Sequence, residues 1–224
     1  MRHRLRYATR WVLRWVILLL VRLCYRLELH GSECLPRHGG ALMVCNHVSF
    51  MDALVLGGAC PRPLRFVMDR PIYDSPWLNW WFRLVGAIPI ESERRDPGAL
   101  RRTLDEVSQA LGEGEIVMVF PEGRLTPNGE VQPFRRGLET ILARDPVPVI
   151  PAGLSGLWGS WTSHCGGPAL SKWPRRFRAR VSLHFGPPIS PHEAGQIALR
   201  RYLEARVRVL KTTADEDVQG GSRD

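Results

Sequence analysis

ALMVCNHVSFMDALVLGGAC, residues 41–60, joins two apolar runs through a short polar segment. The first run has the length and continuous apolar character of a strand covered on both faces, and the second has the size of a short helix. A buried strand that leads into a helix is the repeating unit of a parallel sheet with flanking helices. This stretch therefore predicts an α/β fold, with His47 and Asp52 placed where the strand ends.

The same alternation continues along the chain. Runs typical of short strands occur at 41–45, 64–68, 87–90, 116–120, 147–154 and 179–185. Helical patterns occur at 50–58, 76–85, 97–112, 134–143 and 192–211. Together they predict a central, mostly parallel β-sheet flanked by helices, a fold in which ligands bind where strands end and helices begin.

The polar segment NHVSFMD, residues 46–52, has two interpretations. Ser49 followed by Asp52 fits a capping box at a helix start, and Asn46 could also act as a cap. Capping does not account for His47. A histidine titrates near neutral pH, and a carboxylate that orients its ring produces a general base for a hydroxyl group. The second interpretation therefore makes His47 and Asp52 a catalytic pair.

A second polar segment, FPEGRLT at residues 120–126, follows another buried strand. Gly123 permits a tight turn, and Arg124 offers the planar set of donors that suits a phosphate or carboxylate. Taken alone, the segment could be an ordinary turn in which Glu122 pairs with Arg124. Beside NHVSFMD at neighbouring strand ends, it instead predicts an anion site next to a general base.

The N-terminal segment differs from the rest of the chain in charge. Residues 1–26 hold seven arginines and no acidic residue, so the other 198 residues carry only +2 of the net charge of +9. A nucleic-acid-binding surface would need cations spread over the fold, so we expect no nucleic-acid partner. The five cysteines form no C-x-x-C pair, and we expect no metal site.

Residues 10–27 read as an amphipathic helix. The apolar run from Trp15 to Val21 is seven residues long, far below the roughly 20 needed to cross a bilayer. Arginines occupy one sector of about 160°, which predicts a helix in the membrane interface with its cations at the headgroups; they are Arg10, Arg14, Arg22 and Arg26. The alternative is a helix docked on its own domain. The chain then divides into a membrane-association helix at 1–29, a catalytic domain at 30–211 and a disordered tail at 212–224.

Both polar segments resemble motifs of one family. NHVSFMD is similar to the NHxxxxD block, and FPEGRLT to the FPEG block, of glycerolipid acyltransferases of the lysophosphatidic-acid acyltransferase type. GAIPIE at 86–91 and VPVIPAGLSG at 147–156 are similar to two weaker blocks of that family. The resemblance covers residues 30–190.

The resemblance implies an O-acyltransferase that moves a fatty acyl chain from acyl-CoA or an acylated acyl carrier protein to the free hydroxyl of a lysophospholipid. His47 would be the general base and Asp52 its orienting partner, with no other cofactor. Substrate-binding roles would fall to Asn46, Ser49, Glu122, Gly123, Arg124 and Thr126. The expected partners are membrane lipids, and the expected location is the cytoplasmic face of the inner membrane, as a peripheral or monotopic protein. The tryptophan-rich stretch at 77–82 would pack in the core, lie in the interface or line the acyl-chain tunnel.

Two departures from the family pattern leave the acceptor open. Arg124 follows FPEG directly, whereas the phosphatidate-forming enzymes usually have threonine first. The second block ends in Glu91 rather than a basic residue, with Arg94 and Arg95 further along. Both a phosphomonoester acceptor and a diester lysophospholipid therefore stay possible. A coenzyme-independent transacylase and a non-catalytic lipid-binding member of the same fold share these motifs.

Overall fold

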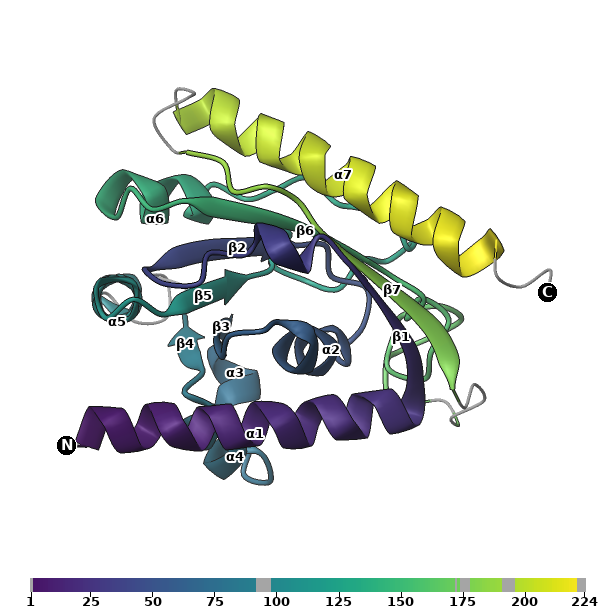
Figure 1. The fold of residues 1–224 in the computed structure, drawn as a ribbon, viewed down its shortest axis with the longest axis horizontal. Coiled ribbons are helices and arrows are strands. Elements are labelled where there is room, and N and C mark those ends of the chain that lie inside the picture. The colour runs from purple at the N-terminus through teal and green to yellow at the C-terminus, as the bar shows by residue number, and fades with distance from the viewer. Residues whose placement is uncertain (1, 92–97, 172, 174–177, 191–195, 221–224) are drawn as a thin grey trace.

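The computed structural model describes residues 2–91, 98–171, 173, 178–190 and 196–220. One seven-stranded sheet organises them, in the order β1-β7-β6-β2-β5-β3-β4 (Figure 1). The strands are β1 (Tyr25–His30), β2 (Ala41–Cys45), β3 (Leu64–Asp69), β4 (Ile88–Ile90), β5 (Ile116–Val119), β6 (Val149–Ser155) and β7 (Ala179–Phe185). All neighbours pair in parallel except β6 and β7, so β1 and β7 run opposite to the rest. The predicted mostly parallel α/β fold is confirmed.

Helices cover both faces of the sheet. They are α1 (Arg2–Cys24), α2 (Asp52–Ala59), α3 (Arg70–Tyr73), α4 (Asn79–Val85), α5 (Ala99–Gly112), α6 (Gly137–Arg144) and α7 (Gln196–Gly220), with a 3₁₀ turn at Ser32–Cys34. Strand β2 shows why both faces need cover: Met43 packs in the core under α1 and α2, while its neighbours Leu42 and Val44 pack under α5, α6 and α7. Two apolar cores therefore sandwich the sheet, as continuously apolar strands require.

Strand β1 was not predicted. We expected helix to continue through 27 and the membrane helix segment through 29, but a strand starts at Tyr25. Tyr25 to His30 pair in parallel register with Ala179 to His184 of β7. This long-range pairing outweighs the local helical pattern, and it ties the end of α1 to the edge of the sheet.

The predicted disordered tail is also wrong for residues 212–220. Helix α7 continues to Gly220 with Ala214 fully buried. Asp215 accepts a hydrogen bond from Ser155 Oγ at 2.5 Å and pairs with Lys211 Nζ at 2.7 Å. Polar residues that would suit a disordered tail are therefore held in a helix by partners on the sheet; residues 221–224 lie outside the described part of the chain.

The orientation of α1 corrects the predicted membrane helix. Arg14 is only 7% exposed and donates from Nε to the carbonyl oxygen of Cys60, the C-cap of α2, while Arg10 pairs with buried Glu115 at 2.5 Å. The cations at 10 and 14 therefore face the protein instead of the headgroups. The helix can dock this closely because Gly58 has no side chain: a Cβ there would lie 2.9 Å from the Cα of Leu18.

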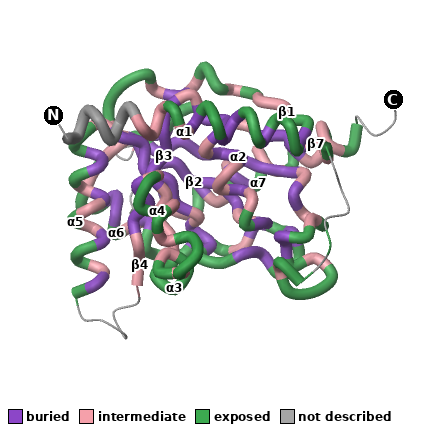
Figure 2. Tube along the Cα trace, turned by 90° about the horizontal axis from the view of Figure 1, so that it is seen from below, coloured by how far each residue is buried: buried purple, intermediate pink, exposed green. Residues whose placement is uncertain are grey.

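Docking leaves an apolar stripe on the outer side of α1, alternating with buried positions along the helix (Figure 2). We call it the α1 outer face; it consists of Val12, Trp15, Val16, Leu19, Leu20 and Leu23. The helix is thus both docked on its own domain and apolar outside. In the described part of the chain, no helix combines the length and apolar character needed to cross a membrane.

Candidate active site

The first polar segment leaves the end of β2 at a fixed position, because Asn46 links two strands. Its Nδ2 donates to the carbonyl oxygen of Leu154 at 2.9 Å, and its Oδ1 accepts from the Leu154 N–H at 2.8 Å. Asn46 is buried and acts as a side-chain substitute for strand pairing between β2 and β6. This role differs from the predicted contact with substrate.

His47 and Asp52 form the pair that their spacing predicted. His47 Nδ1 lies 2.9 Å from Oδ2 of Asp52, whose side chain is completely buried. The same oxygen accepts the peptide N–H groups of Val48 at 2.7 Å and Ser49 at 2.9 Å. The Asp52 carboxylate therefore closes the turn that leads into α2 and fixes the His47 ring, while the helix itself begins without a side-chain cap. With Nδ1 engaged by the carboxylate, Nε2 is the ring nitrogen left for a proton transfer.

Ser49 supports this turn from behind. Its Oγ lies 2.6 Å from Oγ1 of Thr162 and accepts the N–H of Met51 at 3.2 Å. Ser49 is fully buried. The hydroxyl therefore secures the backbone around Asp52, which again differs from the predicted substrate contact.

The second polar segment holds the peptide N–H and carbonyl groups of His47. Glu122 Oε1 accepts the N–H of His47 at 2.8 Å, and the carbonyl oxygen of His47 accepts the N–H of Thr126 at 2.9 Å. Glu122 Oε2 accepts the N–H of Gln132 at 2.9 Å. Glu122 thus binds backbone groups and not Arg124. The alternative of an ordinary turn, in which these two side chains pair, is therefore wrong. Burial raises the pKa of the Glu122 carboxyl to about 7.

Thr126 completes this support. Its side chain is buried and donates from Oγ1 to the carbonyl oxygen of Glu130 at 2.7 Å. With Asn46, Ser49 and Glu122, it makes four predicted substrate-binding residues that lie behind the cavity wall. Each is held by the polar contacts that a buried polar group requires, which explains why none is turned toward a ligand.

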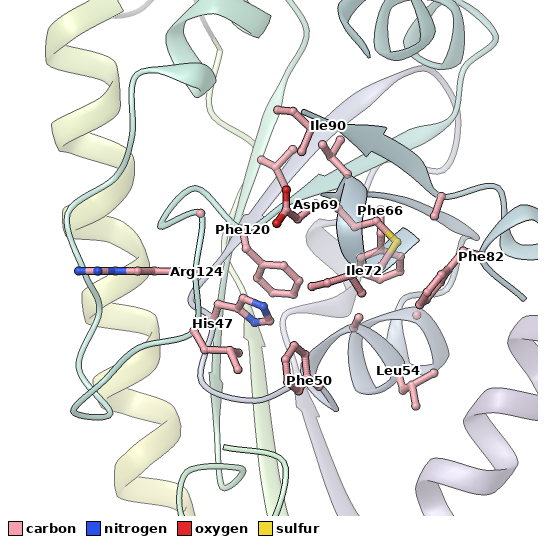
Figure 3. Close-up of a pocket in the computed structure, with 18 of the residues that line it drawn as sticks. His47, Phe50, Leu54, Phe66, Asp69, Ile72, Phe82, Ile90, Phe120 and Arg124 are labelled. Atoms are coloured by element: carbon pink, nitrogen blue, oxygen red, sulfur yellow. The ribbon is translucent and has the colours of Figure 1, made fainter. Parts of the chain in front are cut away.

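A cavity of about 1990 Å³ opens in front of the His47 ring (Figure 3). The ring stacks on Phe120, with ring centres 3.9 Å apart and an angle of 10° between the planes. Apolar side chains from α2, α4 and the carboxyl ends of the strands form most of the remaining wall, among them Phe50, Leu54, Phe66, Ile72, Phe82 and Ile90. The site therefore combines one oriented imidazole with a large apolar space.

The tryptophan-rich stretch divides between the cavity and the surface. Trp81 and Phe82 line the cavity, whereas Trp77 is 84% and Trp80 64% exposed. No residue of α4 is buried in the core. Trp81 is nevertheless half-buried and packs against the core. The core-packing interpretation therefore holds in part, and the rest of the stretch contributes to the cavity wall and to an exposed aromatic surface.

Arginines from three segments line the cavity, and those of α1, Arg10 and Arg14, are already engaged by Glu115 and the Cys60 carbonyl. Gly123 and Arg124 line it as expected, and in Figure 3 the exposed Arg124 side chain points away from the His47 ring. Arg135 also lines the cavity and lies against Gly123, where a Cβ would meet the Arg135 side chain at 2.8 Å. The sequence reasoning missed Arg135, although PFRRG at 133–137 follows the second segment closely. The predicted alternatives Arg94 and Arg95 lie outside the described residues.

Comparison with known proteins agrees with this geometry. A family model described as Acyltransferase matches residues 26–155, more than half of the chain. The chain belongs to the Acyltransferase family. The predicted family is thereby confirmed, and the protein is an acyltransferase enzyme.

Two curated members of the family illustrate how far the similarity extends. The 1-acyl-sn-glycerol-3-phosphate acyltransferase of Bacillus subtilis is 24% identical over 198 residues, which are 85% of this acyltransferase and 90% of the relative. The chloroplastic 1-acyl-sn-glycerol-3-phosphate acyltransferase BAT2 of Brassica napus is 31% identical over 133 residues, 59% of this chain and 38% of its own. The region that matches the family model, residues 26–155, contains both polar segments of the site.

A solved structure supports the fold of this acyltransferase. The crystal structure of the 1-acyl-sn-glycerophosphate acyltransferase of Thermotoga maritima matches with a TM-score of 0.71, covering 92% of this chain and 80% of that one at 24% identity. At this identity the match concerns the fold. The roles of the side chains in this chain rest on their own geometry.

Proposed function

We propose that this acyltransferase moves a fatty acyl chain from an acyl thioester to the free hydroxyl of a lysophospholipid, with 1-acylglycerol-3-phosphate as the preferred acceptor. The observation that carries the proposal is the His47 ring, fixed by a fully buried carboxylate at 2.9 Å and facing an apolar cavity of about 1990 Å³. An oriented base beside a space for acyl chains is what a hydroxyl-to-thioester transfer needs.

The reaction uses His47 Nε2 as the general base. It removes the proton of the acceptor hydroxyl while the oxygen attacks the thioester carbonyl carbon. The carbon–sulfur bond then breaks, an ester bond remains on the lipid, and the thiol leaves with the proton that His47 returns. Asp52 stabilises the charged ring between the two proton transfers. The acyl group passes directly from donor to acceptor, and no protein side chain is acylated.

Arg124 and Arg135 would bind the acceptor phosphate. Both line the cavity, Arg135 against Gly123 and Arg124 next to it in the chain, and each guanidinium presents donors in the fork that matches phosphate oxygens. The exposed Arg124 side chain would turn toward the His47 ring when the phosphate binds. Two arginines suit a phosphomonoester, which carries more charge than a diester. The names of the relatives in Bacillus and Brassica support the same acceptor.

The apolar part of the cavity would hold the acyl chains. Drug-sized ligands occupy pockets of roughly 300–1,000 Å³, so the cavity of about 1990 Å³ has room for more than one such molecule. Each buried methylene contributes about 0.8 kcal/mol to binding. The donor would be acyl-CoA or an acylated acyl carrier protein, since both present the same thioester.

The lipid substrates would be reached from the membrane surface. The α1 outer face lies on a helix that contacts α4 (Figure 1). Exposed Trp80 belongs to α4, and exposed Trp77 lies just before it. An exposed apolar surface with tryptophans is typical of proteins that lie in the bilayer interface. Arg22 in the last turn of α1 and Arg26 in β1 are exposed, and anionic headgroups would meet them there. These features support a peripheral or monotopic enzyme, with the cytoplasmic face of the inner membrane as the proposed location.

The proposal is tested by incubating the purified protein with labelled acyl-CoA or acyl-acyl carrier protein and a panel of lysolipids in mixed micelles. A diacyl product that forms with 1-acylglycerol-3-phosphate and disappears in His47→Ala supports it. Product formed from a diacyl phospholipid donor without any thioester would show a transacylase instead. Lipid binding without product under every condition would show a non-catalytic member of the fold.

A second experiment tests the membrane orientation. Leu19→Glu on the α1 outer face should release the protein from anionic liposomes in a flotation assay, because a buried charge opposes insertion. Arg37→Glu, at an exposed position outside α1, is the control and should change binding much less. Equal release by both variants would contradict the assignment of this face.

A further inference from the structure

We propose that His30, His184 and Asp217 form a binding site for a divalent transition-metal ion, with Zn²⁺ as the best-suited ion. The three residues come from the end of β1, from β7 and from the last turns of α7. Their ligand atoms all lie within 4.8 Å of one another. The inference is independent of the proposed function, because none of the three residues lines the catalytic cavity.

The sheet itself brings the two histidines together. His30 and His184 are register partners in the parallel pairing of β1 with β7, so their side chains stand next to each other on one face. Their rings stack with centres 4.3 Å apart and an angle of 18° between the planes. Stacking keeps both rings close to one carboxylate. An ion lies in the plane of each imidazole that binds it, so the half-exposed His30 ring would turn out of the stack on binding.

Helix α7 supplies the carboxylate. Asp217 Oδ2 lies 2.6 Å from His184 Nε2 and 3.5 Å from His30 Nε2. Ser182 Oγ donates to the same oxygen at 2.9 Å. Metal-binding carboxylates are commonly held by such a second hydrogen bond, which fixes their direction.

The donor set favours particular ions. Two imidazole nitrogens with one carboxylate suit Zn²⁺ and other first-row transition ions, whereas Mg²⁺ and Ca²⁺ prefer oxygen ligands alone. Ligand atoms about 2.0–2.1 Å from a tetrahedral ion lie about 3.3 Å apart. The His30–Asp217 separation of 3.5 Å is already close to that value, and the 2.6 Å contact of His184 has to widen. Three protein ligands leave a fourth position for water.

A metal bound here would fasten α7 to the edge of the sheet. Strand β1 follows α1 directly, so the ion would also connect α7 with the element that carries the exposed apolar helix. Because the unfolded chain lacks the assembled site, binding would stabilise the folded state. The site is therefore proposed as a structural clamp, separate from the chemistry at His47.

The experiment uses the full chain in detergent, freed of any affinity tag and treated with a chelator, which is then removed. Titration with ZnCl₂ should show one bound equivalent, and the melting temperature should rise by several degrees at excess Zn²⁺. His30→Ala and Asp217→Asn should each lower the affinity at least tenfold and remove most of the thermal shift. His38→Ala, an exposed histidine outside the cluster, is the matched control and should bind like the wild type.

Co²⁺ absorption separates this site from the cysteines. Binding at the cluster should give the visible bands of a nitrogen- and oxygen-ligated ion, lost in His30→Ala. Sulfur charge-transfer bands would instead place the metal on cysteine and overturn the proposal. It would also be overturned by the absence of binding, or by stoichiometric binding that persists in both His30→Ala and Asp217→Asn. His30 is about half exposed, so we expect His30→Ala to fold. It is therefore used in place of a variant of the more buried His184.

Discussion

His47 lies 2.9 Å from Asp52, and His184 lies 2.6 Å from Asp217, but the surroundings of the two pairs differ. Asp52 is completely buried, and its partner ring faces an apolar cavity whose wall includes Arg124 and Arg135. Asp217 is 31% exposed at the edge of the sheet, where its neighbour is a second histidine. The surroundings, and not the histidine–carboxylate contact, therefore indicate which pair can perform chemistry on a lipid.

The two pairs also differ in how the chain builds them. Asp52 follows His47 by five residues, and the turn between them is closed by the same carboxylate. The His184–Asp217 contact spans 33 residues and requires α7 to lie across the sheet. A local pair can be recognised from sequence spacing, whereas a distant pair depends on packing.

The largest expected effect is the loss of acyl transfer in His47→Ala. Removal of a general base should lower kcat by about 10³-fold or more, since His47 is the histidine on the cavity wall that a buried carboxylate holds. Rates with 1-acylglycerol-3-phosphate and acyl-CoA in mixed micelles measure it. His38→Ala, an exposed histidine away from the cavity, is the control. Wild-type activity in a folded His47→Ala protein would contradict the mechanism.

Asp52→Asn and Asp217→Asn then compare the two carboxylates directly. We expect Asp52→Asn to lower kcat by about 10²-fold, because an amide cannot stabilise the charged ring and can favour the wrong tautomer. In Asp217→Asn the expected change is a lower melting temperature, because the end of α7 loses its contact with His184. Parallel kinetic and thermal measurements on both variants separate the roles. An equal loss of kcat in both would remove the distinction between the pairs.

The local features of the site could be predicted from the sequence, and the reason is their spacing. The strand at 41–45 has the predicted bounds, and the His47–Asp52 pair follows from a turn of five residues. FPEGRLT was correctly placed after a buried strand. What the spacing could not tell was which of its side chains turn inward: Glu122 binds the peptide N–H groups of His47 and Gln132, contacts that span 75 and 10 residues.

The errors in the helices concern partners far away in the sequence. Arg10 and Arg14 turn inward because Glu115 and the Cys60 carbonyl lie 105 and 46 residues further along the chain. Helix α7 extends through polar residues because Ser155 donates a hydrogen bond to Asp215 and His184 contacts Asp217. Periodicity locates a helix but does not give its rotation, which depends on the residues it meets.

The buried carboxyl of Glu122, which holds the His47 backbone, should make the stability of the protein depend on pH. Burial raises the pKa of its carboxyl from 4.5 to about 7, so between these values the folded protein holds a proton that the unfolded chain has lost. This contribution makes the free energy of unfolding fall as the pH rises from about 4.5 to about 7, by at most about 3 kcal/mol. Glu122→Gln cannot titrate and should show a smaller fall in urea unfolding at pH 5 and pH 8. Glu130→Gln, exposed in the same loop, should keep the wild-type trend; identical pH trends in all three proteins would contradict the role of burial.

The smallest expected effect concerns the cation that spacing missed. Arg135→Ala should raise the KM for 1-acylglycerol-3-phosphate about tenfold with little change in kcat, because a partly exposed guanidinium–phosphate contact is worth about 1–2 kcal/mol. Arg136→Ala is the matched control, since its neighbouring side chain is also exposed but does not line the cavity. The KM for a diester lysophospholipid should rise less than the KM for the monoester, because the diester presents less charge to the same arginine. If the KM rises equally for both acceptors, Arg135 acts on the loop at Gly123 and not on the phosphate. The preference for a monoester would then depend on Arg124.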